Sequence, residues 1–322
     1  MPDKREKTSF NGNYFVGTQA IYAPGWEAYR VAPYAGHTYS EPGYDMLSEF
    51  RECVAATGLN HFKFKMSTNN CASYKISSSK DSELQSLTEL ALVAEVEATL
   101  ADPRFKWYHI WTYSFSLPRK LSEPFTSDQL EAERQEIYDL TKHLLTTYKN
   151  TGKVFFLGNW EGDWELMCAS GCQNHGAIDM DKTPSQEIID KYTKWTKTRQ
   201  QAIDQAKADV GTDGVNVFFY IEFNMGLENF DKIKGALRPT MLNSVVPKVN
   251  PDFLSYSSYK STNKYMDHQG KWFDQAAVDE KYWKVLNHAQ SKLSKTKTFQ
   301  NRHRRWRLAV AVFVEGGMGM RK

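Results

Sequence analysis

The sequence predicts an α/β protein of the (β/α)8 TIM-barrel type, and three observations support this prediction. Short runs of apolar, β-branched and aromatic residues recur along the chain, as in buried strands. Segments with the periodicity of amphipathic helices separate these runs, and strands that alternate with helices indicate a parallel sheet. No G-x-G-x-x-G follows the first run, which reads GTQAIYAPG, so the competing doubly wound dinucleotide-binding fold is disfavoured.

Seven strands are expected, and helices are expected between them. The strands are residues 14–21, 59–66, 107–115, 154–160, 215–223, 253–259 and 308–314. The helices are residues 44–57, 82–100, 128–148, 183–210 and 274–293, with Thr183 as N-cap of the fourth and Asp128 and Glu131 opening the third. We expect a single barrel domain over residues 1–322 that lacks the eighth strand and departs from the barrel pattern after about residue 295.

Composition excludes several classes of protein. The chain of 322 residues is 41% hydrophobic and 25% charged with a net charge of +3, which is typical of a globular protein. Most of it lacks the basic stripe of a nucleic-acid-binding protein, and no run of about 18 apolar residues predicts a membrane span. No secretory signal is visible at the amino terminus, and neither compartment nor oligomeric state follows from the sequence. The aromatic fraction of 14% is high and is typical of proteins with aromatic binding clefts.

Polar residues gather where the expected strands end. In a barrel these ends meet at one face, and residues of equal parity along a strand point to the same side. The residues are Lys63 and Lys65, His109 and Trp111, Asn159, Trp160, Glu161, Asp163 and Trp164, Tyr220, Glu222 and Asn224, Tyr256 and Tyr259, and Glu315. Carboxyl groups that converge shift each other's pKa, so that one can donate a proton while another stays ionised. Indole and phenol rings suit stacking against a sugar.

Two of these strand ends, GNWEGDW and VFVEGG, resemble those of the retaining glycoside hydrolases of clan A, which are (β/α)8 barrels. The resemblance implies that Glu161 is the acid/base, Glu315 the nucleophile and Asn159 a contact of the sugar 2-hydroxyl. It also implies that Tyr256 or Tyr259 hydrogen-bonds the nucleophile. The chain departs from the family where Trp160 separates Asn159 from Glu161.

The resulting hypothesis is hydrolysis of a carbohydrate with retention by double displacement, without a cofactor or a metal. In it Asp163, Glu222 and Asn224 position hydroxyl groups or tune the pKa values of the two catalytic carboxyl groups. Trp160 and Trp164 stack on sugar, and His109, Trp111 and the two tyrosines also contact the substrate.

Two alternatives and one weaker site remain open. The fold could be an inactive carbohydrate-binding barrel, or a lyase of the aldolase type that forms a Schiff base at Lys63 or Lys65. The spacing of Cys168, Cys172 and His175 could hold a metal, but no fourth ligand is evident, so we expect no metal site.

Overall fold

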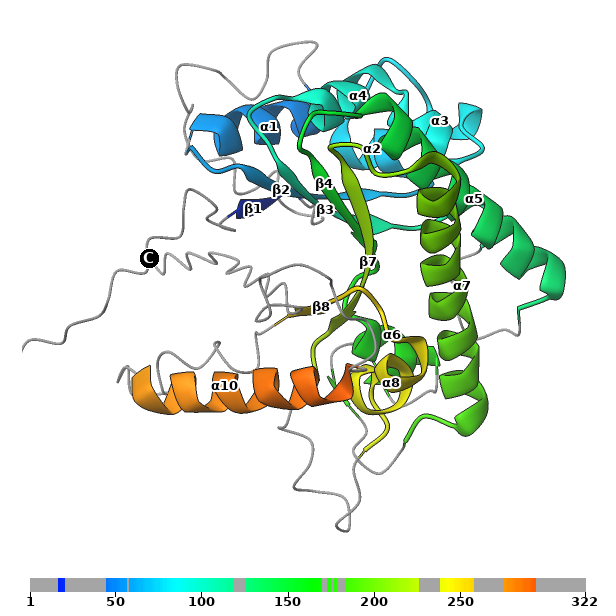
Figure 1. Ribbon diagram of the computed structural model, residues 1–322, viewed down its shortest axis with the longest axis vertical. Coiled ribbons are helices and arrows are strands. Elements are labelled where there is room, and N and C mark those ends of the chain that lie inside the picture. The colour runs from blue at the N-terminus through cyan, green and yellow to red at the C-terminus, as the bar shows by residue number, and fades with distance from the viewer. Residues whose placement is uncertain are drawn as a thin grey trace, which may run out of the picture.

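A computed structural model describes residues 17–20, 45–56, 58–117, 125–169, 173–174, 177–178, 183–225, 238–257 and 275–293. In these residues six strands form one sheet in the order β1–β2–β3–β4–β7–β8 (Figure 1). The strands are β1 (Gly17–Ala20), β2 (His61–Met66), β3 (Trp107–Thr112), β4 (Val154–Gly158), β7 (Asn216–Phe223) and β8 (Phe253–Tyr256). Every neighbouring pair is parallel. The predicted parallel α/β sheet is therefore confirmed, whereas the seventh run, residues 308–314, lies outside the described residues and closure into a barrel stays a prediction.

Helices connect these strands. They are α1 (Met46–Ala56), α2 (Asn70–Tyr74), η2 (Asp81–Glu83), α3 (Leu87–Ala91), α4 (Ala94–Ala101), α5 (Ser127–Thr147), α6 (Gly162–Ala169), α7 (Gln186–Val210), η4 (Met241–Val245), α8 (Val246–Val249) and α10 (Gln275–Lys292). A short antiparallel pair, β5 (Gln173–Asn174) and β6 (Ala177–Ile178), follows α6. None of the described helices is both long enough and apolar enough to cross a membrane.

Three helix predictions are corrected. The single helix expected over residues 82–100 is three short helices, because the Ser86 side chain caps α3 by accepting from Glu89 N and Val93 is extended before α4. The N-cap of α7 is Ser185, which accepts from Ile188 N, and not Thr183. The capping box of α5 pairs Thr126 with Gln129, so the helix begins before the predicted Asp128.

The two faces of the sheet pack differently. One face contributes side chains such as Phe62, Ile110 and Leu157 to the main hydrophobic core, which it shares with α1, α4, α5 and α7. The other face carries a separate aromatic cluster in which Phe156 contacts Phe218 and Phe253, with ring centroids 5.9 and 5.1 Å apart. Helices α5 and α7 lie side by side on the outer side of the sheet (Figure 1).

A contact across the second face shows that the sheet is curved. Lys63 of β2 and Glu222 of β7 are separated by two intervening strands, β3 and β4. In a flat sheet such strands lie roughly 14 Å apart, since neighbours are ~4.8 Å apart. The Lys63 ammonium nitrogen nevertheless lies 3.0 Å from the Glu222 carboxylate. The face opposite the helices is therefore concave, and polar side chains at the carboxyl ends of the strands converge on it.

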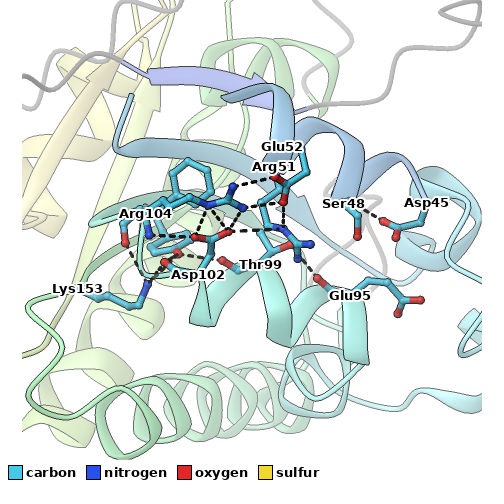
Figure 2. A network of polar contacts seen from close by, with 11 residues as sticks. Asp45, Ser48, Arg51, Glu52, Glu95, Thr99, Asp102, Arg104 and Lys153 are labelled. Atoms are coloured by element: carbon cyan, nitrogen blue, oxygen red, sulfur yellow. Dashed lines mark hydrogen bonds and ion pairs between the residues drawn. The ribbon is translucent and has the colours of Figure 1, made fainter. Parts of the chain in front are cut away.

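A network of charges ties the sheet together at its amino end (Figure 2). Arg104, which precedes β3, donates to both oxygens of Glu52 on α1 and to Asp102 at the end of α4. Lys153, directly before β4, donates to the carbonyl groups of Asp102 and Phe105 at 2.7 and 3.0 Å. Burial lowers the pKa of the Lys153 ammonium group to about 8. This end of a parallel sheet generally serves stability, and the chemistry is sought at the other end.

Candidate active site

Glu161 lies in the short irregular connection between β4 and α6, and hydrogen bonds from its backbone amides to side chains fix this connection. The backbone amide of Trp160 donates to the Tyr113 hydroxyl at 3.0 Å. The amide of Glu161 itself donates to Glu222 Oε1 at 3.1 Å. Its carbonyl group accepts from the amide of Trp164 in the first turn of α6 at 2.9 Å. Glu161 is therefore held at the carboxyl end of the sheet beside a second carboxylate.

Glu222, near the end of β7, is the centre of a buried polar cluster. Its Oε2 atom accepts from Lys63 Nζ of β2 and from Ser255 Oγ of β8, both at 3.0 Å. The Nε2 atom of His109 of β3 lies 3.8 Å from the same oxygen. Burial, with a contribution from the Lys63 charge, lowers the pKa of His109 well below its usual value, so this imidazole is neutral at pH 7. Four strands thus converge on one carboxylate, with the Lys63 ammonium group balancing its charge.

The carboxyl group of Glu161 differs from that of Glu222 in its surroundings. It faces no cation at ion-pair distance among the described residues, and the Ser257 hydroxyl donates to its Oε1 atom. Burial raises the pKa of Glu161 to about 7, and the negative charge of Glu222 adds to this increase. The hydrogen bond from Ser257 lowers the pKa, and Lys63 and Trp164 lower it to a lesser extent. A carboxyl group of this kind is half protonated at neutral pH and can both donate and accept a proton.

Aromatic rings border the two carboxyl groups. The Lys63 ammonium nitrogen lies 4.3 Å from the ring centroid of Trp111, at the end of β3. Trp160 is half-buried and meets Trp111 edge-on, with centroids 6.5 Å apart. The ring of Tyr220 packs against His109 at 4.0 Å. The two indole rings therefore lie next to the carboxyl groups, with Trp111 buried and Trp160 partly exposed.

The amide side chains of Asn159 and Asn224 are buried at the same edge. Asn159 Nδ2 donates to the Trp160 carbonyl group at 3.0 Å. Its Oδ1 atom, and both side-chain polar atoms of Asn224, have no hydrogen-bond partner within the part of the chain that the structure describes. Asn224 is only 3% exposed. Both residues follow strands at the predicted edge and have hydrogen-bonding capacity to offer a bound molecule.

Asp163 serves a different purpose from the predicted contact with substrate. The expected strand 154–160 ends at residue 158, so the alternation that placed Asp163 beside Glu161 does not continue, and Asp163 lies in the first turn of α6. Its fully buried carboxylate accepts from three backbone amides, those of Asn224, Met225 and Met241, at 2.9, 2.9 and 2.7 Å. Asp163 therefore joins α6 to the end of β7 and to η4, which is a structural role.

Tyr256 also lies away from the cluster. It is fully buried in the main core, where its ring stacks on Phe223 at 4.9 Å, and Ser255 takes the place on the concave face. The predicted hydrogen bond from Tyr256 to a nucleophile is not supported by this location. Trp164 is half-buried and packs against Met167 and Met225.

Several predicted residues cannot be placed. Glu315 and Tyr259 lie outside the described residues, as do Cys172 and His175. Cys168 is exposed to solvent. In the described ranges no group of three or more histidine, cysteine or acidic residues could hold a metal ion.

The two lysines considered for Schiff-base chemistry are both engaged. Lys65 Nζ donates to Asn69 and Ser73 near α2, away from the carboxyl groups. Lys63 is the buried partner of Glu222, which favours its protonated form and disfavours a nucleophilic amine.

The predicted site did not include four residues of the cluster: Tyr113, Ser255, Ser257 and His61. His61, the first residue of β2, lies next to His109 on the concave face, with ring centroids 6.1 Å apart. Burial lowers the pKa of His61 to about 4. For Ser255 and Ser257 the signal was the sequence SYSSY, whose alternation places Ser255, Ser257 and Tyr259 on one face and Tyr256 and Ser258 on the other. Only the structure shows which of the two faces is concave.

Comparisons with known proteins give weak similarities. No family model matches the chain, and no curated protein matches it. Among solved structures, a GH5-4 broad-specificity endoglucanase from Clostridium longisporum is similar with a TM-score of 0.40 and 9% identity, over 87% of this chain and 70% of that one. The apo structure of a β-glucosidase, 1317, is similar with a TM-score of 0.36 and 10% identity, over 77% of this chain and 65% of that one. Scores this low do not establish a shared fold or activity.

Proposed function

We propose that the protein is a glycoside hydrolase that cleaves a carbohydrate with retention through two carboxyl groups. The observation that carries the proposal is the environment of Glu161, the proposed acid/base, beside the supporting carboxylate of Glu222. One carboxyl group has its pKa raised to about 7 by burial, and the other is joined to the Lys63 ammonium group. Glycosidase sites typically place carboxyl groups in different environments, so that one can donate a proton while another stays ionised.

Glu161 is the proposed acid/base. In its protonated form it donates the proton to the leaving glycosidic oxygen while the nucleophile attacks the anomeric carbon and forms a glycosyl-enzyme ester. The Glu161 carboxylate then takes a proton from water, whose oxygen attacks the anomeric carbon and releases the nucleophile. We assign the nucleophile to Glu315. Glu222 orients the Glu161 backbone, and its charge favours the protonated form of the acid.

The substrate contacts follow from the same edge. Trp160 and Trp111 provide apolar surfaces for a sugar ring, with Trp164 and Tyr259 as further proposed contacts. Asn159 is proposed to bind the 2-hydroxyl group, and Asn224 and His109 other hydroxyl groups. The Oδ1 atom of Asn159 and both polar side-chain atoms of Asn224 are buried without hydrogen-bond partners among the described residues, and this supports this part of the proposal because a sugar would satisfy them.

Trapping with a panel of activated 2-deoxy-2-fluoro glycosides tests the proposal, with intact mass and peptide mapping as readouts. We expect a stoichiometric adduct on Glu315. The Glu161→Gln variant should lose turnover of substrates with poor leaving groups but still hydrolyse dinitrophenyl glycosides, faster with azide present. Glu187→Gln, at an exposed position in the first turn of α7, is the control.

The outcomes separate the hypotheses. An adduct on Glu222 would keep glycoside hydrolysis and overturn the assignment of Glu315. Sugar binding without any adduct or hydrolysis across the panel would contradict the enzyme and indicate the inactive carbohydrate-binding barrel.

A further inference from the structure

A second buried ion pair lies on the opposite side of the sheet from the candidate site. Arg199 of α7 and Glu133 of α5 form it, and their side chains are 1% and 0% exposed. Trp195 Nε1 donates to Glu133 Oε1 at 2.9 Å, and the Ser114 hydroxyl donates to Oε2. The guanidinium group also lies 4.6 Å from the centroid of the Trp195 ring. Charges buried this deeply require partners of this kind, so the pair is well defined in position.

The guanidinium group of Arg199 reaches the ends of two strands. Its Nη2 atom donates to the carbonyl oxygen of Thr112, the last residue of β3, at 2.7 Å. Its Nη1 atom lies 3.5 Å from the carbonyl oxygen of Gly158, the last residue of β4, which also accepts from Thr112 Oγ1 at 3.1 Å. Both carbonyl groups lie at the end of the sheet. The Arg199 side chain of α7 therefore provides the donor that a neighbouring strand would provide further inside the sheet.

Gly158 is confined from the other side as well. A Cβ atom at this position would lie 2.5 Å from the Tyr220 ring and 2.6 Å from the Tyr220 carbonyl oxygen. The backbone of Gly158 therefore lies between Tyr220 on the concave face and Arg199 on the helix face. Glu161 follows three residues later, through a connection that is not part of a helix or strand.

We infer that Arg199 and Glu133 are positioning residues for Glu161: they fix the ends of β3 and β4 from the helix side and so place the Glu161 carboxyl group beside Glu222. The catalytic meaning of this inference rests on the proposed function. Loss of the anchor at Gly158 would let the connection shift and would strain the hydrogen bond from the Glu161 amide to Glu222. Displacements of about 1 Å can lower turnover about 100-fold.

A double variant, Arg199→Met with Glu133→Gln, separates positioning from stability. Removing one partner alone would leave a buried charge, whereas replacing both partners by neutral groups of similar size is often tolerated. The control is Arg104→Met with Glu52→Gln, which removes a partly exposed ion pair at the amino end of the sheet, far from Glu161 in the fold, and leaves Asp102 with Arg51 as a partner.

Two readouts do not depend on enzymatic activity. One is the titration of the Glu161 carboxyl group by NMR of protein labelled with ¹³C-glutamate, assigned with Glu161→Gln. The other is hydrogen exchange of the amides of Trp160 and Glu161. In the full-length double variant we expect the Glu161 midpoint to fall by at least about half a pH unit toward its ordinary value, and amide exchange to accelerate at least tenfold. The control should match the wild type in both.

Turnover of a substrate found by glycoside screening is the third readout. We expect kcat of the double variant to fall about 100-fold with KM changed less than about twofold, since the anchor acts on the acid/base and not on binding. If the double variant does not fold, Arg199→Lys replaces it, because lysine keeps the charge next to Glu133 but cannot also reach both carbonyl groups.

A folded double variant, or Arg199→Lys, with wild-type titration and exchange of Glu161 would overturn the inference. Altered titration and exchange in a protein whose wild type hydrolyses no glycoside would support the positioning role and contradict the proposed function.

Discussion

Replacing Glu161 by glutamine should stabilise the folded protein at alkaline pH. The unfolded chain ionises this carboxyl group near pH 4.5, whereas the folded protein holds its proton up to about pH 7 because the side chain is buried. Between these values the unfolded state loses its proton first, so the free energy of unfolding falls as the pH rises and the full penalty applies above pH 7. The difference between 4.5 and about 7, at 1.36 kcal/mol for each pH unit, corresponds to about 3 kcal/mol.

Glutamine carries no charge and can still accept the hydrogen bond from Ser257. Glu161→Gln should therefore match the wild type near pH 4 and exceed it by about 3 kcal/mol at pH 8. Urea unfolding followed by tryptophan fluorescence from pH 4 to 8.5 measures this, provided that the two proteins have equal m-values. Glu187→Gln should show no such trend. A variant that is no more stable than the wild type at pH 8, or a difference that does not depend on pH, would refute the reasoning.

Three further predictions concern buried charges. Lys63→Met should lower the free energy of unfolding at pH 7 by ~3–5 kcal/mol, because Glu222 stays buried without its cation. Adding Glu222→Gln should restore most of the loss. A decrease of less than ~1 kcal/mol in urea unfolding would contradict a stabilising ion pair. We expect the thermal stability of the wild type to rise from about pH 8 to 10.5, where the unfolded chain binds more protons because burial lowers the pKa of folded Lys153 to about 8, and Lys153→Met should abolish this rise in thermal unfolding followed over that pH range. Asp163→Asn should cost ~2–4 kcal/mol and speed amide exchange at Met225, since an amide cannot accept as a carboxylate does, and unchanged exchange would argue against this role.

The six strands of the parallel sheet could be predicted because a buried strand has a local signature in the sequence, a short run of apolar residues between turn signals. The segment 82–100 shows where this local information ends. Its leucine, alanine and glutamate content favours a continuous helix, but the Ser86 cap and the extended Val93 divide it. Capping by a hydroxyl side chain contributes only about 1 kcal/mol, so its choice among nearby serines and threonines depends on tertiary packing.

For the candidate site, the position of Glu161 and Glu222 at the carboxyl ends of two strands predicted that both lie at the same edge of the sheet, whereas strand parity was a poorer guide. It failed for Asp163, because the strand ends at residue 158 and alternation has no meaning beyond its end. It failed for Tyr256, because alternation gives two faces without saying which is concave. The pairing of Lys63 with Glu222 depends on sheet curvature, which the sequence of any single strand does not encode.

The contact between Lys63 and Glu222 also has a kinetic consequence. The two residues are 159 positions apart in the sequence, and they meet only after the strands between them have paired and bent. Contacts that close long loops are costly in chain entropy and tend to form late in folding. Substitutions here should therefore accelerate unfolding and leave the folding rate nearly unchanged. We therefore expect the charges of the candidate site to come together after most of the hydrophobic core has formed.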